Sequence, residues 1–309
     1  MRMLLAIDQS KDSKAAITLL QKMQWPAGST LILLHVTTID DRPVPTESSR
    51  LSRKKSGDAE EPLARVQSEL QRLEQLLGSD TLQVQSMVVN GVPGQEILNA
   101  IQKKKIDVVA LGSRGLSRIS GLLMGSVSEW VLNDALCSVL IGRPTARRGK
   151  SSNTLNVLLA TDGSPDAWKA VDILKELGLP PESTITLLHV IKKHMYETAQ
   201  CVDRAGKSQA EFSKLAKDLC RDRDSAGVRL LKATRDALGS LSLTIQERVA
   251  LGHETEEILK AARQQTADLI LMGSRGKTGL RRFLMGGVAR TVSRHAPCSV
   301  LVVRAPKKT

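Results

Sequence analysis

A glycine-rich segment that occurs twice constrains this chain more than any other feature of its sequence. The tetrapeptide Gly-Ser-Arg-Gly stands at 112–115 and again at 273–276, and each copy is followed at the same distance by Leu-Met-Gly, which ends at Gly125 and Gly286. A lone Gly-x-x-Gly is most often a turn or the end of a helix. Two copies with shared sequence and spacing indicate instead that a structural unit is duplicated.

The duplication extends over most of the chain. Met-Leu-Leu-Ala-Ile-Asp at 3–8 matches Val-Leu-Leu-Ala-Thr-Asp at 157–162, and Leu-Leu-His-Val at 33–36 recurs at 187–190. The extra residues of the second copy fall between His189 and Gly252, in a polar stretch over 192–239 that we expect to be helical. A length of 309 residues agrees with two domains. We therefore predict domains at 1–143 and 155–309, joined by a polar and basic linker at 144–154.

Each copy alternates apolar runs with amphipathic segments. In the first copy, strands are expected at 1–8, 30–36, 82–89, 108–111 and 137–141, and helices at 13–23, 63–77, 93–102 and from 126 onward. Residues 40–62 are rich in Pro, Ser and charge, and we expect a mobile insertion there. Apolar runs without alternation are typical of parallel strands covered on both faces. The pattern predicts an α/β fold of two tandem doubly wound, Rossmann-like parallel sheets, each five-stranded with order 3-2-1-4-5 and flanked by helices.

Such a sheet binds its ligand beyond the carboxyl ends of the strands, where the strand order reverses. The reversal lies between strand one, which ends at Asp8, and strand four, which is followed by Gly112; the second copy places Asp162 and Gly273 likewise. Glycines leave backbone N–H groups accessible, and the helix that begins after Gly125 adds unpaired donors and partial positive charge. We therefore predict an anion-binding, phosphate-type cradle in each copy.

The composition limits the kinds of partner and ligand that we expect the protein to bind. The formal net charge is +13, but the basic residues are spread along the chain and aromatics are only 2%, so a solvated surface is favoured over a nucleic-acid interface. The four cysteines (Cys137, Cys201, Cys220, Cys298) form no metal-ligand spacing, so no metal site is predicted, and Cys137 and Cys298 are expected to be buried small residues. No apolar run approaches the roughly 20 residues of a membrane span, and the N-terminus is unlike a signal peptide. We expect a cytoplasmic protein without a membrane partner.

At these residues the sequence resembles the universal stress protein (UspA) family, in its tandem, ATP-binding form. The family's nucleotide-binding pattern is G-2x-G-9x-G-[ST], and the first copy fits it with Gly112, Gly115, Gly125 and Ser126. The resemblance implies ATP, with its phosphates against those residues, Val127 next on the helix, adenine near the backbone of Val36, and Asp8 at the adenosine end. The equivalent positions of the second copy are Asp162, Val190, Gly273, Gly276, Gly286, Gly287 and Val288. Gly287 departs from the pattern because it has no hydroxyl, which predicts a weaker second site.

For several side chains the sequence leaves two interpretations open. Arg114 and Arg275 either contact phosphate or are solvated loop residues. Asp8 and Asp162 either act as bases or, more commonly for a carboxylate at a strand end, orient a ribose or cap the next helix. His35 and His189 are expected to be paired with a neighbour rather than catalytic. Trp130 is expected in the core, close enough to the cradle to report ligand binding.

Three functions follow from this sequence. The first is an ATP-binding stress-response protein in which occupancy stabilises one conformation or assembly. The alternatives are a slow ATPase with Mg²⁺ bridging the phosphates, for which no catalytic residue is assigned, and an interaction scaffold with incidental nucleotide binding. The two domains are expected to pack as a pseudo-dimer, because the apolar fifth strands at 137–141 and 298–303 would otherwise be open sheet edges; a homodimer is the alternative.

Overall fold

The computed structural model describes residues 1–38, 60–115, 123–145, 153–192, 225–239, 243–276 and 285–305. Contacts divide the chain into two compact units, Met1–Gln21 with Trp25–Arg143 and Lys22–Gln24 with Pro144–Thr309. Most of the insertion predicted at 40–62 lies outside the described residues, but its last residues already belong to a helix that begins at Glu60. The polar stretch predicted to be helical from 192 is also corrected. Lys192 ends a strand, 193–224 lie outside the described residues, and 225–238 form a helix.

The first unit contains five parallel strands in the order β3-β2-β1-β4-β5, which confirms the predicted order. Its elements along the chain are β1 (Arg2–Ala6), α1 (Lys11–Lys22), β2 (Ser29–Thr37), α2 (Glu60–Leu77), β3 (Leu82–Asn90), α3 (Pro93–Lys104), β4 (Val108–Gly112), α4 (Ser126–Asp134) and β5 (Ser138–Gly142). The order reverses between β1 and β4, where Leu4 pairs with Val109.

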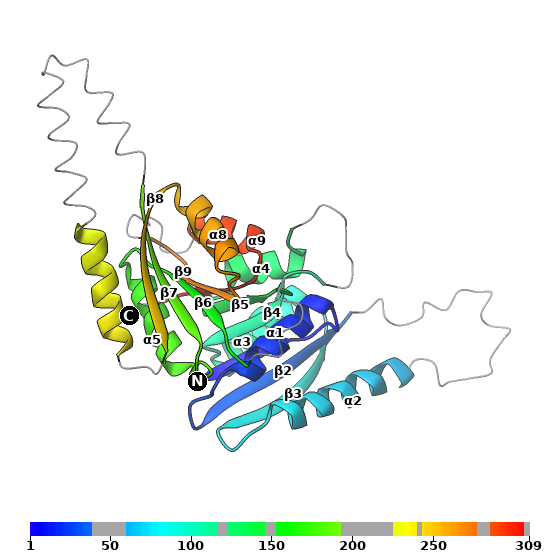
Figure 1. Ribbon diagram of the computed structural model, residues 1–309. Helices are drawn as coiled ribbons and strands as arrows, with labels where there is room; N and C mark the ends of the chain where they lie inside the picture. The colour runs from blue at the N-terminus through cyan, green and yellow to red at the C-terminus, as the bar shows by residue number, and fades with distance from the viewer. Residues whose placement is uncertain are drawn as a thin grey trace, which may run out of the picture. The chain divides into compact units, whose positions relative to one another are not determined.

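The second unit repeats this arrangement in the order β8-β7-β6-β9-β10, again all parallel. Its elements are β6 (Asn156–Ala160), α5 (Pro165–Glu176), β7 (Thr184–Lys192), the helix at 225–238, β8 (Thr244–Gly252), α8 (Glu254–Gln264), β9 (Leu269–Gly273), α9 (Gly287–His295) and β10 (Ser299–Val303). Figure 1 shows α8 and α9 on one face of these strands and α5 with the helix at 225–238 on the other. The order reverses between β6 and β9.

The core of each unit is made by the apolar strands that the sequence pattern picked out. Leu4, Leu5, Val109 and Ala110 are fully buried, as are their counterparts in β6 and β9. Each buried leucine or valine stabilises the fold by about 1.5–3 kcal/mol, and helices on both faces require the continuous apolar runs seen in these strands. Polar residues are therefore displaced to the strand ends, where the candidate site lies.

Other expectations about the core are partly corrected. Cys137 and Cys298 are buried, as predicted. Trp130 is not a core residue: its side chain is 38% exposed, and one face of the ring lies against α3, where a Cβ at Gly94 would come 2.4 Å from Trp130 Cε3. The glycine in α3 thus makes room for the indole.

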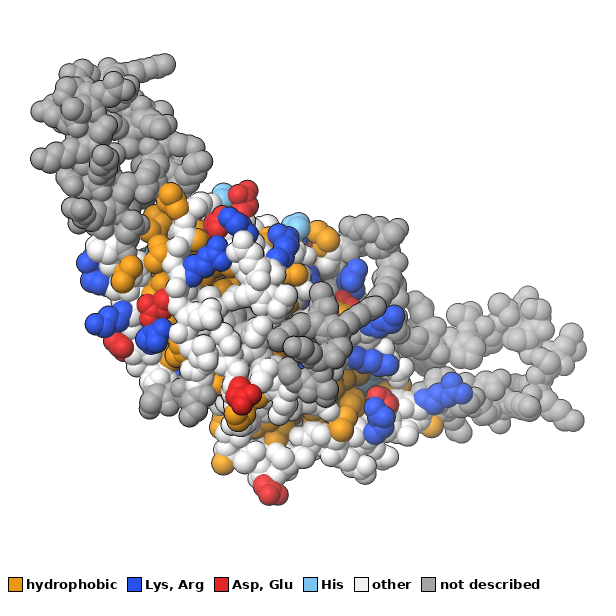
Figure 2. All heavy atoms as spheres, viewed as in Figure 1, with side chains coloured by type: hydrophobic (Ala, Val, Ile, Leu, Met, Phe, Trp, Pro, Cys, Tyr) orange, Lys and Arg blue, Asp and Glu red, His pale blue; other side chains and the backbone are white. Residues whose placement is uncertain are grey.

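The surface shows charges of both signs. On the face seen in Figure 2, the lysine and arginine side chains of the described residues are interspersed with aspartate and glutamate. None of the helices in the described ranges is both long enough and apolar enough to cross a membrane.

Candidate functional site

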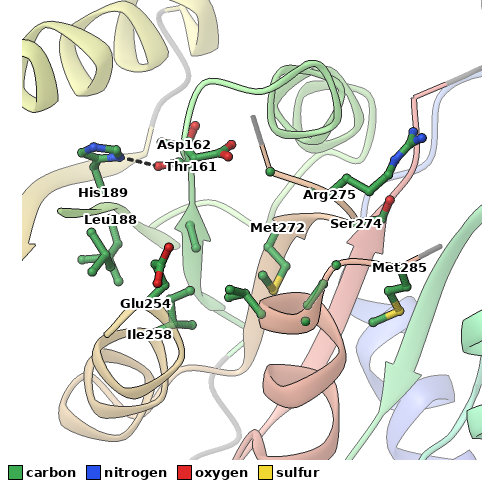
Figure 3. Close-up of a pocket in the computed structure, with 18 of the residues that line it drawn as sticks. Thr161, Asp162, Leu188, His189, Glu254, Ile258, Met272, Ser274, Arg275 and Met285 are labelled. Atoms are coloured by element: carbon green, nitrogen blue, oxygen red, sulfur yellow. Dashed lines mark hydrogen bonds between the residues drawn. The ribbon is translucent and has the colours of Figure 1, made fainter. Parts of the chain in front are cut away.

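A pocket of about 790 Å³ opens in the second unit, at the carboxyl ends of β6, β7 and β9. Its walls are the ends of these strands, the first turns of α8 and α9, and the glycine segment 273–276 (Figure 3). The volume lies within the roughly 300–1,000 Å³ that small-molecule sites span. The pocket therefore occupies the switch point that the strand order predicts.

All seven residues predicted for the second site line this one pocket. They come from the ends of β6 and β7, the segment after β9 and the start of α9, and they are Asp162, Val190, Gly273, Gly276, Gly286, Gly287 and Val288. In the first unit, Asp8, Gly112, Arg114, Gly115 and Gly125 are brought together in the same way, while Val36 lies in β2 and Ser126 and Val127 begin α4. Their contact with a ligand remains a prediction.

The first glycine of each Gly-Ser-Arg-Gly segment is required by packing of the protein itself. A Cβ at Gly112 would lie 2.6 Å from the backbone nitrogen of Ser13, and one at Gly273 would lie 2.8 Å from that of Ala167. The end of the fourth strand in each unit thus passes directly over the start of the first helix. No side chain fits there, so these glycines position the loop whether or not a ligand is bound.

The second glycine of each segment faces a strand-end carboxylate. A Cβ at Gly115 would be 2.9 Å from Asp8 Oδ2, and one at Gly276 would be 2.9 Å from Asp162 Oδ2. The other oxygen of each carboxylate accepts a backbone hydrogen bond two residues on, from Ser10 at 3.1 Å and from Ser164 at 2.9 Å. Both aspartates therefore accept a hydrogen bond from the turn before the first helix and lie close to the glycine loop.

A backbone hydrogen bond closes each glycine segment. The N–H of Gly125 donates to the carbonyl of Ser113 at 2.8 Å, and the N–H of Gly286 donates to the carbonyl of Ser274 at 2.8 Å. These two amides hold the loop against the helix start. The donors that face outward are the first amides of α4 and α9, at Ser126, Val127, Gly287 and Val288, because the first turn of a helix has no intrahelical acceptor for them.

A buried aspartate that the sequence analysis did not single out organises each loop. Asp12 Oδ2 accepts hydrogen bonds from Ser113 Oγ at 2.5 Å and Arg114 Nε at 3.4 Å. Its counterpart Asp166 accepts from Ser274 Oγ at 2.6 Å and, through both oxygens, from Arg275 Nε and Nη2 at 3.1 Å each. The arginines of Gly-Ser-Arg-Gly therefore hold the loop to the first helix.

Asp166 is ionised in this setting. Burial raises the pKa of Asp166, but hydrogen bonds from Arg275, Ser274 and the backbone of Ala305, together with the positive charge of Arg275, outweigh it and bring the pKa below its ordinary value. The backbone N–H of Ala305 donates to Oδ1 at 3.1 Å, so the carboxylate also binds the segment that follows β10.

The two strand-end histidines are paired, as predicted. His35 Nδ1 lies 2.8 Å from the carbonyl oxygen of Ile7, and His189 Nδ1 lies 2.8 Å from that of Thr161, an interaction drawn in Figure 3. A carbonyl oxygen only accepts, so Nδ1 carries the proton in both rings. The rings thereby fasten the second strand of each unit to the residue that follows the first.

Two charged residues complete the wall of the second pocket, and sequence analysis missed both. Lys192 ends β7 and Glu254 begins α8, and Lys192 Nζ lies 2.8 Å from Glu254 Oε1. Ile258, one turn further along α8, adds an apolar side chain beside them. No group of three or more His, Cys, Asp or Glu side chains that could hold a metal occurs among the residues with described positions.

Comparisons with known proteins agree with this architecture. A model of the Universal stress protein family matches residues 1–143 and again 154–304. A putative universal stress protein of Staphylococcus epidermidis is 32% identical over 155 residues, covering 48% of this chain and 83% of that protein. A universal stress protein structure from Archaeoglobus fulgidus covers 100% of this chain and 97% of its own, with 22% identity and a TM-score of 0.61. A family protein of Arabidopsis thaliana, solved with AMP bound, covers 50% of this chain and 98% of its own, with 17% identity and a TM-score of 0.33. The chain therefore belongs to the universal stress protein family, with one family domain in each half.

Proposed function

We propose that the protein is a cytoplasmic, ATP-binding universal stress protein, with one ATP site at the strand-order reversal of each unit, between its first and fourth strands. The observation that carries the proposal is the pocket of the second unit, which joins outward-facing helix amides at one end to an apolar cleft at the other.

The two ends of the pocket suit the two ends of a nucleotide. The start of α9 favours anionic groups through its first amides and the partial positive charge of the helix end. Leu188, Val190 and Ile258 form the apolar end, which suits a purine ring. We propose that the phosphates lie at Gly287 and Val288 and that the base lies beside Val190.

In the first unit the residue that begins the helix of the cradle is a serine, which adds a hydroxyl group. Ser126 is exposed as the first residue of α4, at the position where α9 begins with Gly287. Its Oγ–H would donate to a phosphate oxygen in addition to the backbone amides. For this reason the sequence pattern ranks the first site above the second for the phosphate end of ATP.

The proposal assigns ATP a regulatory effect through occupancy. A ligand at 100 times its Kd stabilises the state that binds it by about 2.7 kcal/mol, which is enough to move an equilibrium between two conformations or assemblies. Slow hydrolysis with Mg²⁺ would end such a state. Measuring phosphate release with and without Mg²⁺ tests that activity separately from binding.

The proposal is tested by denaturing freshly purified protein, identifying the nucleotide released, and titrating the stripped protein with ATP by calorimetry. Two variants block one site each. Gly125→Val and Gly287→Val place a side chain at the mouth of a cradle, where the Cβ atom itself meets no steric conflict: a Cβ at Gly125 has only ordinary contacts of 3.5 Å or more, and one at Gly287 meets no atom within 4 Å. Each variant is expected to remove one ATP per chain. Absence of ATP, ADP and AMP binding in the unaltered protein would refute the proposal and favour a scaffold.

A further inference from the structure

The Lys192–Glu254 ion pair lies at the apolar end of the second pocket, beside Leu188 and Ile258. Figure 3 shows Leu188, Glu254 and Ile258 on one side of the pocket, and Ser274, Arg275 and Met285, next to the glycine segments, on the other. Glu254 shares its wall with apolar side chains and is 21% exposed, whereas Lys192 is 56% exposed. The carboxylate therefore belongs to the pocket, and the ammonium group holds it from the solvent side.

A pair this accessible contributes little to stability, so its place in the pocket wall is the more informative property. Lys192 engages Oε1 at 2.8 Å. An ionised carboxylate has two oxygens and about four lone-pair sites, and it can only accept hydrogen bonds. Glu254 thus offers a hydrogen-bond acceptor with a fixed position to whatever occupies the apolar end of the pocket.

The first unit lacks this acceptor. The residue that begins α3 is Pro93, where α8 begins with Glu254, and β2 is followed by Thr38 where β7 ends with Lys192. The backbone is the same in both places: the residues before these helix starts, Val92 and His253, have φ and ψ of −82° and 118°, and −84° and 125°. At these helix starts the two units therefore share their backbone conformation and differ in their side chains.

We propose that Glu254, held by Lys192, recognises the exocyclic 6-amino group of adenine in the second pocket, so that this site is selective for a 6-aminopurine nucleotide while the first site is not. This inference rests on the proposed ATP site. At the apolar end a purine presents its ring edge, and the adenine amine is a donor that matches an acceptor-only carboxylate. A base without that amine would offer no donor to the carboxylate, which would keep only its pairing with Lys192.

The test compares ATP with purine riboside 5′-triphosphate, which is ATP without the amino group. Calorimetry on the Gly125→Val protein reports the second pocket, and on the Gly287→Val protein it reports the first. We expect the second pocket to prefer ATP about ten- to a hundredfold, the usual effect of a hydrogen bond to a charged group. We expect the first pocket to bind both nucleotides with about equal affinity, because Pro93 stands where the second unit has Glu254.

Replacing Glu254 by proline gives the second unit the residue that the first unit has at the equivalent position, Pro93. Proline is tolerated as the first residue of a helix, and His253 already has the extended backbone that precedes proline. Glu254→Pro should abolish the preference for ATP, and Glu254→Gln, which keeps a neutral acceptor, should retain about a threefold to tenfold preference. Glu257→Gln is the matched control, because Glu257 is on the same helix and pairs with Lys260 at 3.3 Å; it should leave the preference unchanged.

Each result decides the inference. A preference that survives Glu254→Pro would overturn it while leaving the ATP site intact. If the variant instead changes the ratio between ATP and 2′-deoxy-ATP, Glu254 contacts the sugar and the inference is wrong. Tighter binding of GTP than of ATP at the second pocket would also overturn it. Absence of any nucleotide binding would refute the inference and the proposed function together, and transfer of the preference to the first pocket by Thr38→Lys with Pro93→Glu would support it independently.

Discussion

Gly287→Ser tests whether a single hydroxyl separates the two cradles. Gly287 is the first residue of α9, and its counterpart in α4 is Ser126. A Cβ at Gly287 meets no atom within 4 Å, so serine enters without displacing any neighbour in the described structure. The substitution therefore adds to the second cradle the group that the family's pattern specifies.

The size of the effect follows from one hydrogen bond. A neutral hydroxyl that donates to a ligand contributes about 0.5–1.5 kcal/mol net, which corresponds to an increase in affinity of about twofold to tenfold. Serine is also a better helix former than glycine, by a few tenths of a kcal/mol, so the free protein should become slightly more stable. Gly287→Ala separates these contributions, because it changes the backbone preference and adds no hydroxyl.

The assay is calorimetric titration of ATP into the Gly125→Val protein, with and without each second substitution. We expect Gly287→Ser to lower the Kd at the second cradle and Gly287→Ala to leave it close to that of glycine. Ser126→Ala in the Gly287→Val protein should show the reverse loss at the first cradle. Equal affinities for the serine and alanine variants would refute a hydrogen bond from a hydroxyl at position 287 to the phosphates.

Three other predictions concern the loop, the turn and the sheet edge. Asp166→Asn should destabilise the second unit by about 1–3 kcal/mol at neutral pH, because Arg275 and Ser274 lose a charged acceptor. The pKa of Asp166 is lowered in the folded protein. Its carboxylate therefore stabilises the fold at pH values above the ordinary carboxylate pKa, and this contribution is lost as pH falls through the lower folded-state pKa. In urea unfolding at several pH values, a stability difference between Asp166→Asn and the unaltered protein that grew at acid pH would contradict this. Gln9→Gly should stabilise the first unit by up to about 1 kcal/mol, because Gln9 has φ of 61° where the second unit has Gly163; an unchanged urea midpoint would count against strain there. Residues 1–143 expressed alone should self-associate, because β5 ends their sheet, and a sedimentation profile of a soluble monomer would argue against the proposed pseudo-dimer.

The fold could be predicted from the sequence because the apolar runs, the amphipathic segments and the internal repeat all indicated the same architecture. Apolar runs such as 3–7 and 108–111 have no alternation, which only a sheet covered on both faces accommodates, and the duplication supplied a second independent reading of each element. The boundaries were less predictable. β7 extends to Lys192, two residues past the repeated Leu-Leu-His-Val at 187–190, because strand pairing with β8 continues through Lys192 and Gly252.

The candidate glycines lie at strand ends and helix starts, as the sequence pattern indicates, and their contact with a ligand stays a prediction. Sequence alone did not show the physical reason for which each glycine is needed. The pattern treats Gly112 and Gly125 as equal members of a phosphate cradle. The structure distinguishes them, because a Cβ at Gly112 would come within 2.6 Å of the backbone of Ser13, whereas one at Gly125 has ordinary contacts. Close approach between a strand end and a helix start depends on tertiary packing, which no local pattern encodes.

The residues that were missed are those whose role arises from the assembled fold. Asp12 and Asp166 occupy equivalent places in the first turn of α1 and α5, where an acidic residue commonly just complements the helix dipole. Only the fold shows that each is buried beneath a Gly-Ser-Arg-Gly loop. Comparison of the repeats could have found them, because both aspartates follow the strand-end aspartates Asp8 and Asp162 at the same distance.

The hydroxyl of Ser126 and the carboxylate of Glu254 predict opposite orders of ATP affinity for the two sites. The hydroxyl of Ser126 favours the first cradle by about twofold to tenfold, whereas a hydrogen bond from the adenine amine to the charged Glu254 favours the second by about ten- to a hundredfold. If both hold, the second pocket binds ATP more tightly, which reverses the order that the glycine pattern alone predicts. Nucleotide that co-purifies at one per chain should then remain in the Gly125→Val protein and be lost from the Gly287→Val protein. The opposite result would place the tighter site in the first unit and would limit Glu254 to discriminating between bases at a weaker site.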